Sequence, residues 1–530
     1  MNHAARPPCF DGSKADMDFL VVILQSGMGS LVSYLAAHVL LCLVPAFFVA
    51  GALSALVPQA SVVRFLGPGA SKWVAYPAAA GAGSLLAVCS CTVQPLFAGI
   101  YKQGAGLGPA MTFMFFAPAA NILALSYTGV ALGGEFALAR LVLSLVFGVG
   151  IGMIMAVLFH RDDMARTAQI ESFQDNAGVS RMTFVFLLAL VALLIGGTLK
   201  VTPLTAQLWS ADLTWPWASK AQTTLDLWLP MDALRGEEGL SLQGTVLIGL
   251  LGLIGMTSLR GLGKVDEGFN KLTWTSLSLI ALTLIFAAVG INATAEGLHV
   301  ALTGRTVVVA TLLAALVPLA SRFDAWDIQQ WLWETWRFVK QIFPLLVAGV
   351  FIVGVIRVFI EPAWVQTVAG SNTLLGNMAG VVFGVFMYFP TLVEVPVAKM
   401  LLSMGMHPGP LLAYIMADPE LSLQSMLITA SIIGRRKTAT YVALVAVFAT
   451  AAGLAYGAWS DGRPVWQIVL SVAALGLALA AGAGAGSERA AGAASAGLAV
   501  TVTPAPLPMA PISAPTLTVS PGLAAIDSSV

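Results

Sequence analysis

The sequence predicts an all-α, polytopic integral membrane protein made of two structural repeats with broken or re-entrant helices. Scarce charge and long uncharged stretches predict the membrane class, and paired Gly and Pro interruptions predict the repeats. Only 10% of the 530 residues are charged and 58% are hydrophobic, whereas roughly a quarter are charged in a soluble globular protein. No Asp, Glu, Lys or Arg occurs from Phe19 to Val63, and about 20 apolar residues cross a bilayer as a helix. The lipid bilayer is therefore a predicted partner.

Charge balance and missing motifs exclude several functions. The 26 basic and 26 acidic residues cancel, so the chain has no electrostatic attraction for nucleic acid. No Walker loop or dinucleotide fingerprint occurs, which argues against ATP-driven pumping by this chain, and we expect no cofactor. Four cysteines are too few for a disulfide framework. The N-terminus lacks a basic start with a cleavage site, so no removable signal peptide is expected.

Apolar runs predict a series of spans, and Gly and Pro interrupt two regions, 89–121 and 390–422, where broken or re-entrant helices are expected. Basic loops around Arg161, Lys264 and Arg436 are expected in the cytoplasm. The predicted spans are 31–57, 73–88, 109–129, 136–159, 182–199, 242–258, 273–291, 302–320, 338–360, 374–390, 409–433, 438–458 and 465–485.

Six segments follow from this pattern. They are an N-terminal segment (1–30), a first permease repeat (31–160), linking transmembrane helices and loops (161–337), a second permease repeat (338–460), a final transmembrane helix (461–485) and a disordered tail (486–530). The tail consists mainly of Ala, Gly, Ser, Thr and Pro, and such a composition cannot bury enough apolar surface to order itself.

The predicted repeat aligns two parts of the chain at a shift of 301 residues. The shift places Ser90–Pro95 on Thr391–Pro396, Gly104 on Gly405, Gly108-Pro109 on Gly409-Pro410 and Pro118 on Pro419. The simpler explanation is that Gly and Pro recur in any spanning helix. Paired breaks in two halves are, however, typical of a transporter's binding site. Because 136–159 ends at a basic loop and 438–458 begins at one, the halves are expected to be inverted.

Cys89 and Cys91 are the sharpest candidate ligands. Residues i and i+2 point to nearly opposite sides of a helix, so both thiols meet one ligand only if the helix is broken, which Pro95 makes plausible. Thiolates select Cu(I), Zn and, by the same logic, trivalent arsenic. Cys89 and Cys91 are thus candidates for binding a substrate or a metal, and the alternative is two small residues packed between helices. Cys42 and Cys9 are expected to be inert.

The second repeat carries acids where the first has apolar residues. Glu394 corresponds to Val93, Asp418 to Ala117 and Glu420 to Ala119. Ionisable groups within spans are costly and usually face a cavity, where they relay protons or bind cations. We therefore expect the three carboxylates to couple protons. Alternatively, Asp418 and Glu420 lie in an interfacial loop and cap the next half-helix.

Asn121 and Ser422 occupy matching positions just after the second break of each repeat. Their amide and hydroxyl groups are candidate substrate contacts, with helix capping as an equal alternative. Lys102 and Lys399 are single charges near the breaks and are expected to snorkel to an interface.

These motifs resemble the ArsP-type permeases. The likeness is carried by Ala87–Met111, which contains Cys-Ser-Cys, by Ala117–Leu125, and in the second half by Glu394-Val-Pro396, Gly405–Pro410, Leu421-Ser-Leu423 and Gly434–Thr438. It covers about 33–160 and 338–458. The resemblance implies a secondary permease, because characterised relatives export trivalent organoarsenicals and others are linked to copper or zinc efflux. Cys89, Cys91, Pro95, Asn121, Glu394 and Pro396 match the family's motifs.

One run departs from the family pattern. Ala417-Asp-Pro-Glu420 replaces the Gly-Pro form of many members. Two acids at this position suit a cationic or proton-coupled substrate better than a neutral arsenical.

The sequence thus predicts a permease of the inner cell membrane that exports a thiophilic solute, such as a trivalent arsenical or a soft metal ion, in exchange for protons. The expected substrate contacts are Cys89, Cys91, Pro95, Asn121 and Ser422, and the expected proton carriers are Glu394, Asp418 and Glu420. No enzymatic activity is expected. The alternatives are a membrane thiol-redox enzyme that uses the two thiols, and a non-transporting accessory subunit. A homo-oligomer is compatible with the sequence.

Overall fold

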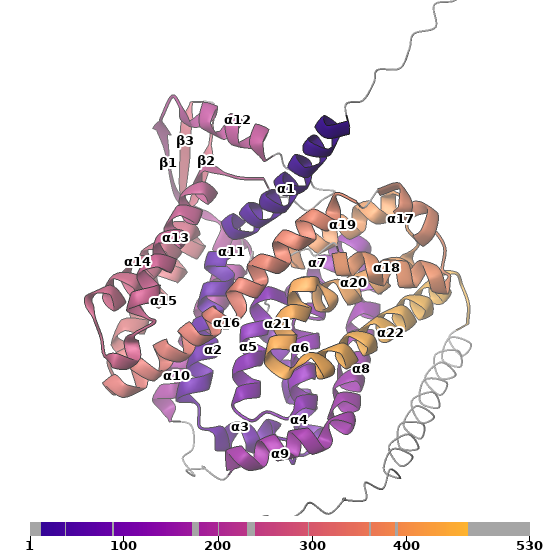
Figure 1. Cartoon of the computed structure of the whole chain (residues 1–530), viewed down its shortest axis with the longest axis horizontal. Helices are drawn as coiled ribbons and strands as arrows, with labels where there is room; N and C mark the ends of the chain where they lie inside the picture. The colour runs from indigo at the N-terminus through magenta and orange to yellow at the C-terminus, as the bar shows by residue number, and fades with distance from the viewer. Residues whose placement is uncertain are drawn as a thin grey trace, which may run out of the picture. The chain divides into compact units, whose positions relative to one another are not determined.

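The computed structural model describes residues 12–37, 39–86, 90–171, 180–199, 201–229, 239–294, 296–359, 362–386 and 391–464. The predicted final helix and tail lie outside the described residues, apart from residues 461–464. Within the described ranges the chain is helical except for one small sheet (Figure 1).

Most helices coincide with the apolar runs of the sequence. The first part of the chain contains α1 (Gly12–Ala37), the π-helical turn η1 (Val39–Leu43), α2 (Val44–Leu56), α3 (Gln59–Leu66), α4 (Lys72–Leu86), α5 (Ser90–Lys102), α6 (Leu107–Ala119), α7 (Ile122–Leu132), α8 (Gly134–Leu158) and α9 (His160–Glu171). The middle part contains α10 (Arg181–Thr198), α11 (Thr202–Thr205), α12 (Ala218–Trp228), α13 (Leu242–Gly261), the 3₁₀ turn η2 (Val265–Glu267), α14 (Lys271–Ala288) and α15 (Gly304–Ala320). The last part contains α16 (Ala325–Arg357), α17 (Pro362–Ala369), α18 (Leu374–Phe386), α19 (Thr391–Ser403), α20 (Pro408–Leu421), α21 (Leu423–Ile433) and α22 (Arg435–Ser460).

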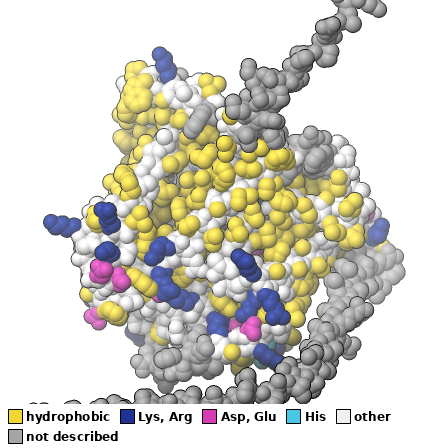
Figure 2. All heavy atoms as spheres, in the orientation of Figure 1, with side chains coloured by type: hydrophobic (Ala, Val, Ile, Leu, Met, Phe, Trp, Pro, Cys, Tyr) yellow, Lys and Arg dark blue, Asp and Glu magenta, His cyan; other side chains and the backbone are white. Residues whose placement is uncertain are grey.

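Six of the described helices are long and apolar enough to cross a membrane, or up to eight spans if each of two bent pairs counts as one. The bent pairs are Ile23–Ala36 with Leu40–Leu56, at 51°, and Leu107–Ala119 with Ala124–Leu132, at 41°. Hydrophobic side chains cover the middle of the face in Figure 2, and charged side chains gather along its lower edge. The predicted class, an all-α polytopic membrane protein, is confirmed.

A small antiparallel sheet is the fold feature that the sequence analysis missed. It consists of β1 (Gln207–Thr214), β3 (Gly297–Thr303) and β2 (Gly290–Ala293), in that spatial order. Asp212 lies opposite His299, and their side chains meet at 2.6 Å. β1 lies in a segment expected to be a loop, and β3 reaches into the start of a predicted span. The strands are short, and their pairing joins segments about 90 residues apart, which no local pattern reveals.

Two sets of five helices have similar lengths and spacing, and four of the five pairs match in length to within one residue. We call α4–α8 the first set and α18–α22 the second set. A shift of 301 residues places α5 on α19 and α7 on α21 residue for residue, whereas α6 and α8 end one residue before α20 and α22. The turns match as well, because Gly104 and Gly405 have φ of 95° and 96°. Such positive φ values strain any residue with a Cβ, so glycine is required at both turns.

The helices α8 and α22 run antiparallel and touch along their lengths. Phe136 near the start of α8 meets Tyr456 near the end of α22, with ring centroids 5.1 Å apart. At the opposite ends, the ammonium group of Lys437 lies 5.7 Å from the ring centroid of Phe159. Between them, Phe147 meets Phe448 at 5.0 Å, and these two residues are themselves 301 apart.

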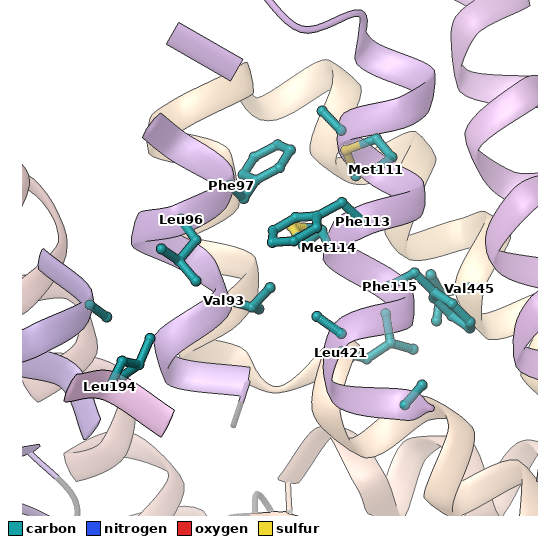
Figure 3. Packing of buried hydrophobic residues seen from close by; sticks show 14 of the residues in the cluster. Val93, Leu96, Phe97, Met111, Phe113, Met114, Phe115, Leu194, Leu421 and Val445 are labelled. Carbon is teal, nitrogen blue, oxygen red and sulfur yellow. The ribbon is translucent and has the colours of Figure 1, made fainter. Parts of the chain in front are cut away.

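The short helices α6 and α20 form the centre of the described body. Every residue of α6 is buried, as is every residue of α20 from Gly409 to Leu421. Both are apolar on nearly all sides, a pattern typical of helices enclosed by others. Figure 3 shows α6 side chains such as Met111 and Met114 packed toward Phe97 of α5. The ends of these two helices are therefore shielded from the surface.

Candidate functional site

The candidate site lies where α6 and α20 end. Pro118 and Pro419 lie inside the last turns of these helices, and the backbone breaks two to three residues later, at Ala120–Asn121 and Ser422. A proline removes one backbone donor but does not by itself end a helix that is already in its last turn. Irregular backbone at membrane depth is tolerated only where it is buried or lines a cavity.

Arg140 of α8 is the most prominent site residue that the sequence analysis missed. Its side chain is completely buried and donates three hydrogen bonds. Nε donates to the carbonyl of Ala119 (2.7 Å), Nη1 to the hydroxyl of Thr128 (3.1 Å) and Nη2 to Oε2 of Glu394 (3.2 Å). The Ala119 carbonyl lies at the negative end of the α6 dipole, which favours a cation. Arg140 is the only charged residue within 136–159, and that signal could have revealed it.

Glu394 lies in the first turn of α19 and is completely buried. Its Oε2 accepts from Arg140, whereas its Oε1 has no hydrogen-bond partner among the described residues. The pair joins the first set to the second across 254 positions. A buried ion pair has a high desolvation cost, and ionisable groups at membrane depth mark functional pathways.

Asp418 and Glu420 lie inside α20, with exposures of 0% and 3%. The alternative that they occupy an interfacial loop and cap the next half-helix is therefore wrong. They lie at the C-terminal end of α20, where the helix dipole disfavours negative charge. Oε2 of Glu420 accepts a hydrogen bond from the hydroxyl of Tyr441 on α22 (2.5 Å), and its Oε1 has no partner within the described ranges.

Buried amides and hydroxyls extend this polar region between the sets. Oε1 of Gln94 on α5 accepts from the hydroxyl of Thr429 on α21 (3.2 Å). The side-chain amide of Gln424 is 1% exposed, and neither its nitrogen nor its oxygen has a hydrogen-bond partner in the described part of the chain. Buried polar groups are nearly always hydrogen-bonded, so the exceptions call for a water, ion or ligand.

The residues predicted to contact substrate have the following surroundings. Pro95 is buried within α5. Asn121 caps α7, because its Oδ1 accepts from the Ala124 N–H (2.8 Å) and its Nδ2 donates to the Ala117 carbonyl (2.9 Å). Capping, the alternative reading of Asn121, is thus what the structure contains. Ser422 donates to the hydroxyl of Ser425 at 2.8 Å, and its substrate contact stays a prediction.

The thiol motif is described only in part. Cys89 lies outside the described residues, and Cys91 lies in the first turn of α5, where its side chain is not described. Cys42 lies in the π-helical turn η1, with its Sγ 2.5 Å from the hydroxyl of Thr92. This contact brings a third cysteine next to the first turn of α5, and π-helical turns are frequent at functional sites. The described side chains contain no group of three or more His, Cys, Asp and Glu that could hold a metal ion.

Charged residues at the ends of the helices form ion pairs. Lys102, expected to snorkel, pairs with Glu334 of α16, which also binds Arg337 at 3.2 Å. Lys399 is exposed. Lys437 lies 3.7 Å from Asp162, so two of the three basic loops predicted for the cytoplasm meet at one edge of the protein.

Comparisons with known proteins agree with this architecture. The family model ArsP_1, described as a predicted permease, matches residues 26–458. The chain is similar to the UPF0718 protein MJ0584 of Methanocaldococcus jannaschii, with 29% identity over 444 residues that cover 83% of this chain and 98% of the relative. No solved structure matches the chain. With its apolar helices, the chain therefore belongs to the ArsP_1 family of predicted permeases and is a multi-pass membrane transport protein.

Proposed function

We propose that this permease exports a thiophilic solute, such as a trivalent organoarsenical or a soft metal ion, across the inner membrane in exchange for protons. The observation that carries the proposal is the pair of buried carboxylates, Glu394 and Glu420. Each has one oxygen without a hydrogen-bond partner among the described residues. A carboxylate oxygen in this condition can accept a proton or bind a cation, and such groups within a membrane protein typically serve transport.

The two helix sets supply the framework for alternating access. We infer that 31–160 and 338–460 are inverted repeats. The matched bounds of the two sets and the antiparallel contact of α8 with α22 support this inference. In a symmetric contact, equivalent residues meet on the axis, as Phe147 and Phe448 do. Inverted repeats with broken helices at their junction are the architecture of many secondary carriers.

Helices of one set contact helices of the other in pairs that the shift of 301 residues makes equivalent. The helix α19 packs against α7, and α5 packs against α21, the two equivalent combinations. Ser144 of α8 donates to Sδ of Met416 on α20 (3.4 Å). The equivalent residues, Val445 of α22 and Phe115 of α6, belong to one buried cluster (Figure 3). A substrate at this junction would contact both repeats at once.

The proposed roles divide between thiols and acids. Cys89 and Cys91 bind the solute, because thiolates prefer soft centres, with Pro95, Asn121 and Ser422 shaping the broken backbone around it. Glu394, Asp418 and Glu420 carry protons. Arg140 is a positioning residue: it holds Glu394 across the junction and neutralises it while no proton is bound.

Uptake into everted inner-membrane vesicles tests the proposal, with a panel of trivalent arsenicals, Cu(I) and Zn(II) and an imposed pH gradient. We expect wild-type vesicles to accumulate at least one of these solutes and to release protons in return. Cys89→Ser/Cys91→Ser should abolish uptake but preserve the folded protein. If that variant transports every solute as the wild type does, the thiol assignment is wrong.

A separate variant tests the proton assignment. Glu420→Gln should remove the dependence of uptake on the pH gradient, and Glu135→Gln, at an exposed carboxylate in the first turn of α8, serves as the matched control. Unchanged proton release by Glu420→Gln would contradict a proton role for this residue without affecting the thiol assignment.

A further inference from the structure

A crevice separate from the candidate site lies between four helices. It encloses about 250 Å³ between α2, α13, α14 and α16, and apolar side chains such as Phe47, Ile280, Trp336 and Phe343 line it. Its mouth includes Leu259, which is 63% exposed. The helices α13, α14 and α16 are long and apolar enough to cross a membrane, and α2 belongs to a bent pair that passes the same test.

One hydroxyl of the crevice lining has no hydrogen-bond partner among the described residues. It belongs to Ser258 of α13, which is 2% exposed. The other hydroxyl of the lining, that of Thr335, donates to the carbonyl of Trp331 (2.8 Å). A buried hydroxyl without an acceptor is costly. The crevice therefore suits an apolar chain that carries one hydrogen-bond acceptor.

Positive charges lie just beyond the crevice, at the end of α13. Ser258 is three residues before the last residue of this helix, Gly261, which corresponds to roughly 4–5 Å at the rise of an α-helix. Arg260, Lys264 and Lys271 follow and are all exposed. Two carboxylates share the loop, and Glu267 is 3.6 Å from Lys264, which leaves an excess of positive charge.

We propose that this crevice is a binding site for an anionic phospholipid. One acyl chain fills the apolar space, its ester carbonyl accepts from Ser258, and its phosphate lies against Arg260, Lys264 and Lys271. Ser258 and Arg260 lie in the last turns of α13, Lys264 follows this helix and Lys271 begins α14, so the hydroxyl and the cations are all near the end of the crevice-lining helix. Clusters of basic residues next to membrane-spanning helices attract anionic lipid headgroups. The proposal does not depend on what the permease transports.

Native mass spectrometry of the full chain from mixed phosphatidylglycerol and phosphatidylcholine vesicles tests the site. We expect about tenfold enrichment of retained phosphatidylglycerol, and loss of this preference in the triple variant Arg260→Gln/Lys264→Gln/Lys271→Gln. Equal retention of the two lipids by the wild type would overturn the proposal and identify the crevice as a nonselective apolar space. This comparison of two lipids uses only the wild-type protein, so its outcome does not depend on whether a variant folds.

Three further variants locate the lipid. A Cβ at Gly255, in the crevice lining, would meet no heavy atom within 4 Å, and the same holds for Gly252 on the same helix outside the lining. Gly255→Phe should fill the crevice and release the lipid, whereas Gly252→Phe should retain it. Ether-linked phosphatidylglycerol, which lacks the ester carbonyl, should bind the wild type as weakly as the ester lipid binds Ser258→Ala. The site is refuted if Gly255→Phe and Gly252→Phe retain the same amount of lipid.

Discussion

Position 140 in the first set and its counterpart 441 in the second set hold an arginine and a tyrosine on equivalent helices. Both side chains reach the end of the buried half-helix of their own set: Arg140 donates to the carbonyl of Ala119, and Tyr441 donates to the carboxylate of Glu420. Residues 119 and 420 are also equivalent. The same two positions of each set are therefore in contact, with different chemistry in each set.

The change makes the two halves of the site electrically different. In the first set the guanidinium group of Arg140 extends across the junction and binds Glu394 of the second set. In the second set the hydroxyl of Tyr441 binds Glu420, which belongs to the same set. The two sets thus have matching helix bounds but different charged residues: Arg140 lies in the first set, and Glu394 and Glu420 lie in the second. The comparison teaches that the matched helix bounds place these two contacts alike, and that the residue types at positions 140 and 441 give them different charge.

The largest expected effect comes from breaking the ion pair that joins the sets. Arg140→Gln or Glu394→Gln alone leaves a buried charge without its partner, and each should destabilise the protein by about 3–5 kcal/mol. The double variant removes both charges and should recover most of this loss. Thermal unfolding in lipid nanodiscs measures the three variants, and Arg337→Gln, whose side chain is 49% exposed, is the control.

The double variant also separates stability from transport. Because this variant lacks the proton-carrying Glu394, it should be folded but insensitive to the pH gradient. Additive destabilisation in the double variant, with no recovery, would show that the two residues do not act as a pair.

A smaller effect is expected in the second set. Tyr441→Phe leaves the ring in place but removes the donor to Glu420, which should cost about 1–3 kcal/mol because the buried carboxylate loses its described hydrogen bond. Chemical denaturation would measure this loss. Tyr127→Phe, at a tyrosine that is 37% exposed, should change little. Equal stability of both variants would mean that the hydroxyl–carboxylate contact contributes nothing to the fold.

The smallest effect is expected at the two equivalent glycine turns. Gly104→Ala and Gly405→Ala place a Cβ at a positive φ in equivalent turns, and each should cost about 1–2 kcal/mol. Because the two turns have nearly the same φ, the two losses should agree. Gly81→Ala is the control, since its Cβ would meet no heavy atom within 4 Å and its φ is not positive. Clearly unequal losses would show that the turns differ in their surroundings despite their matching φ.

The sequence predicted features that depend on neighbouring residues. Gly and Pro marked the turns and breaks, and the rarity of charge made Glu394, Asp418 and Glu420 stand out. The sequence could not predict that Glu394 meets Arg140, because that pairing depends on how α19 packs against the first set. The capping role of Asn121 could not be separated from substrate contact, since both require the same amide just after a break.

Other features could not be predicted because they also depend on contacts between residues far apart in the sequence. The contact of Cys42 with Thr92 joins residues 50 positions apart through a π-helical turn, and no residue pattern marks such a turn. Tyr441 reads as an ordinary aromatic residue of a spanning helix until the burial of Glu420 gives its hydroxyl a partner. Tertiary contacts, rather than composition, thus define most of the polar residues around the site.

The meeting of Phe147 with Phe448 has a consequence for measuring motion. If the two sets exchange conformations during transport, each residue takes over the surroundings of its counterpart 301 positions away. A pair made of two counterparts is then mapped onto itself, so the spacing between positions 147 and 448 is the same in the two end states of the cycle. Spectroscopic labels at these two positions would give an internal length standard, against which pairs away from the axis report every change of state.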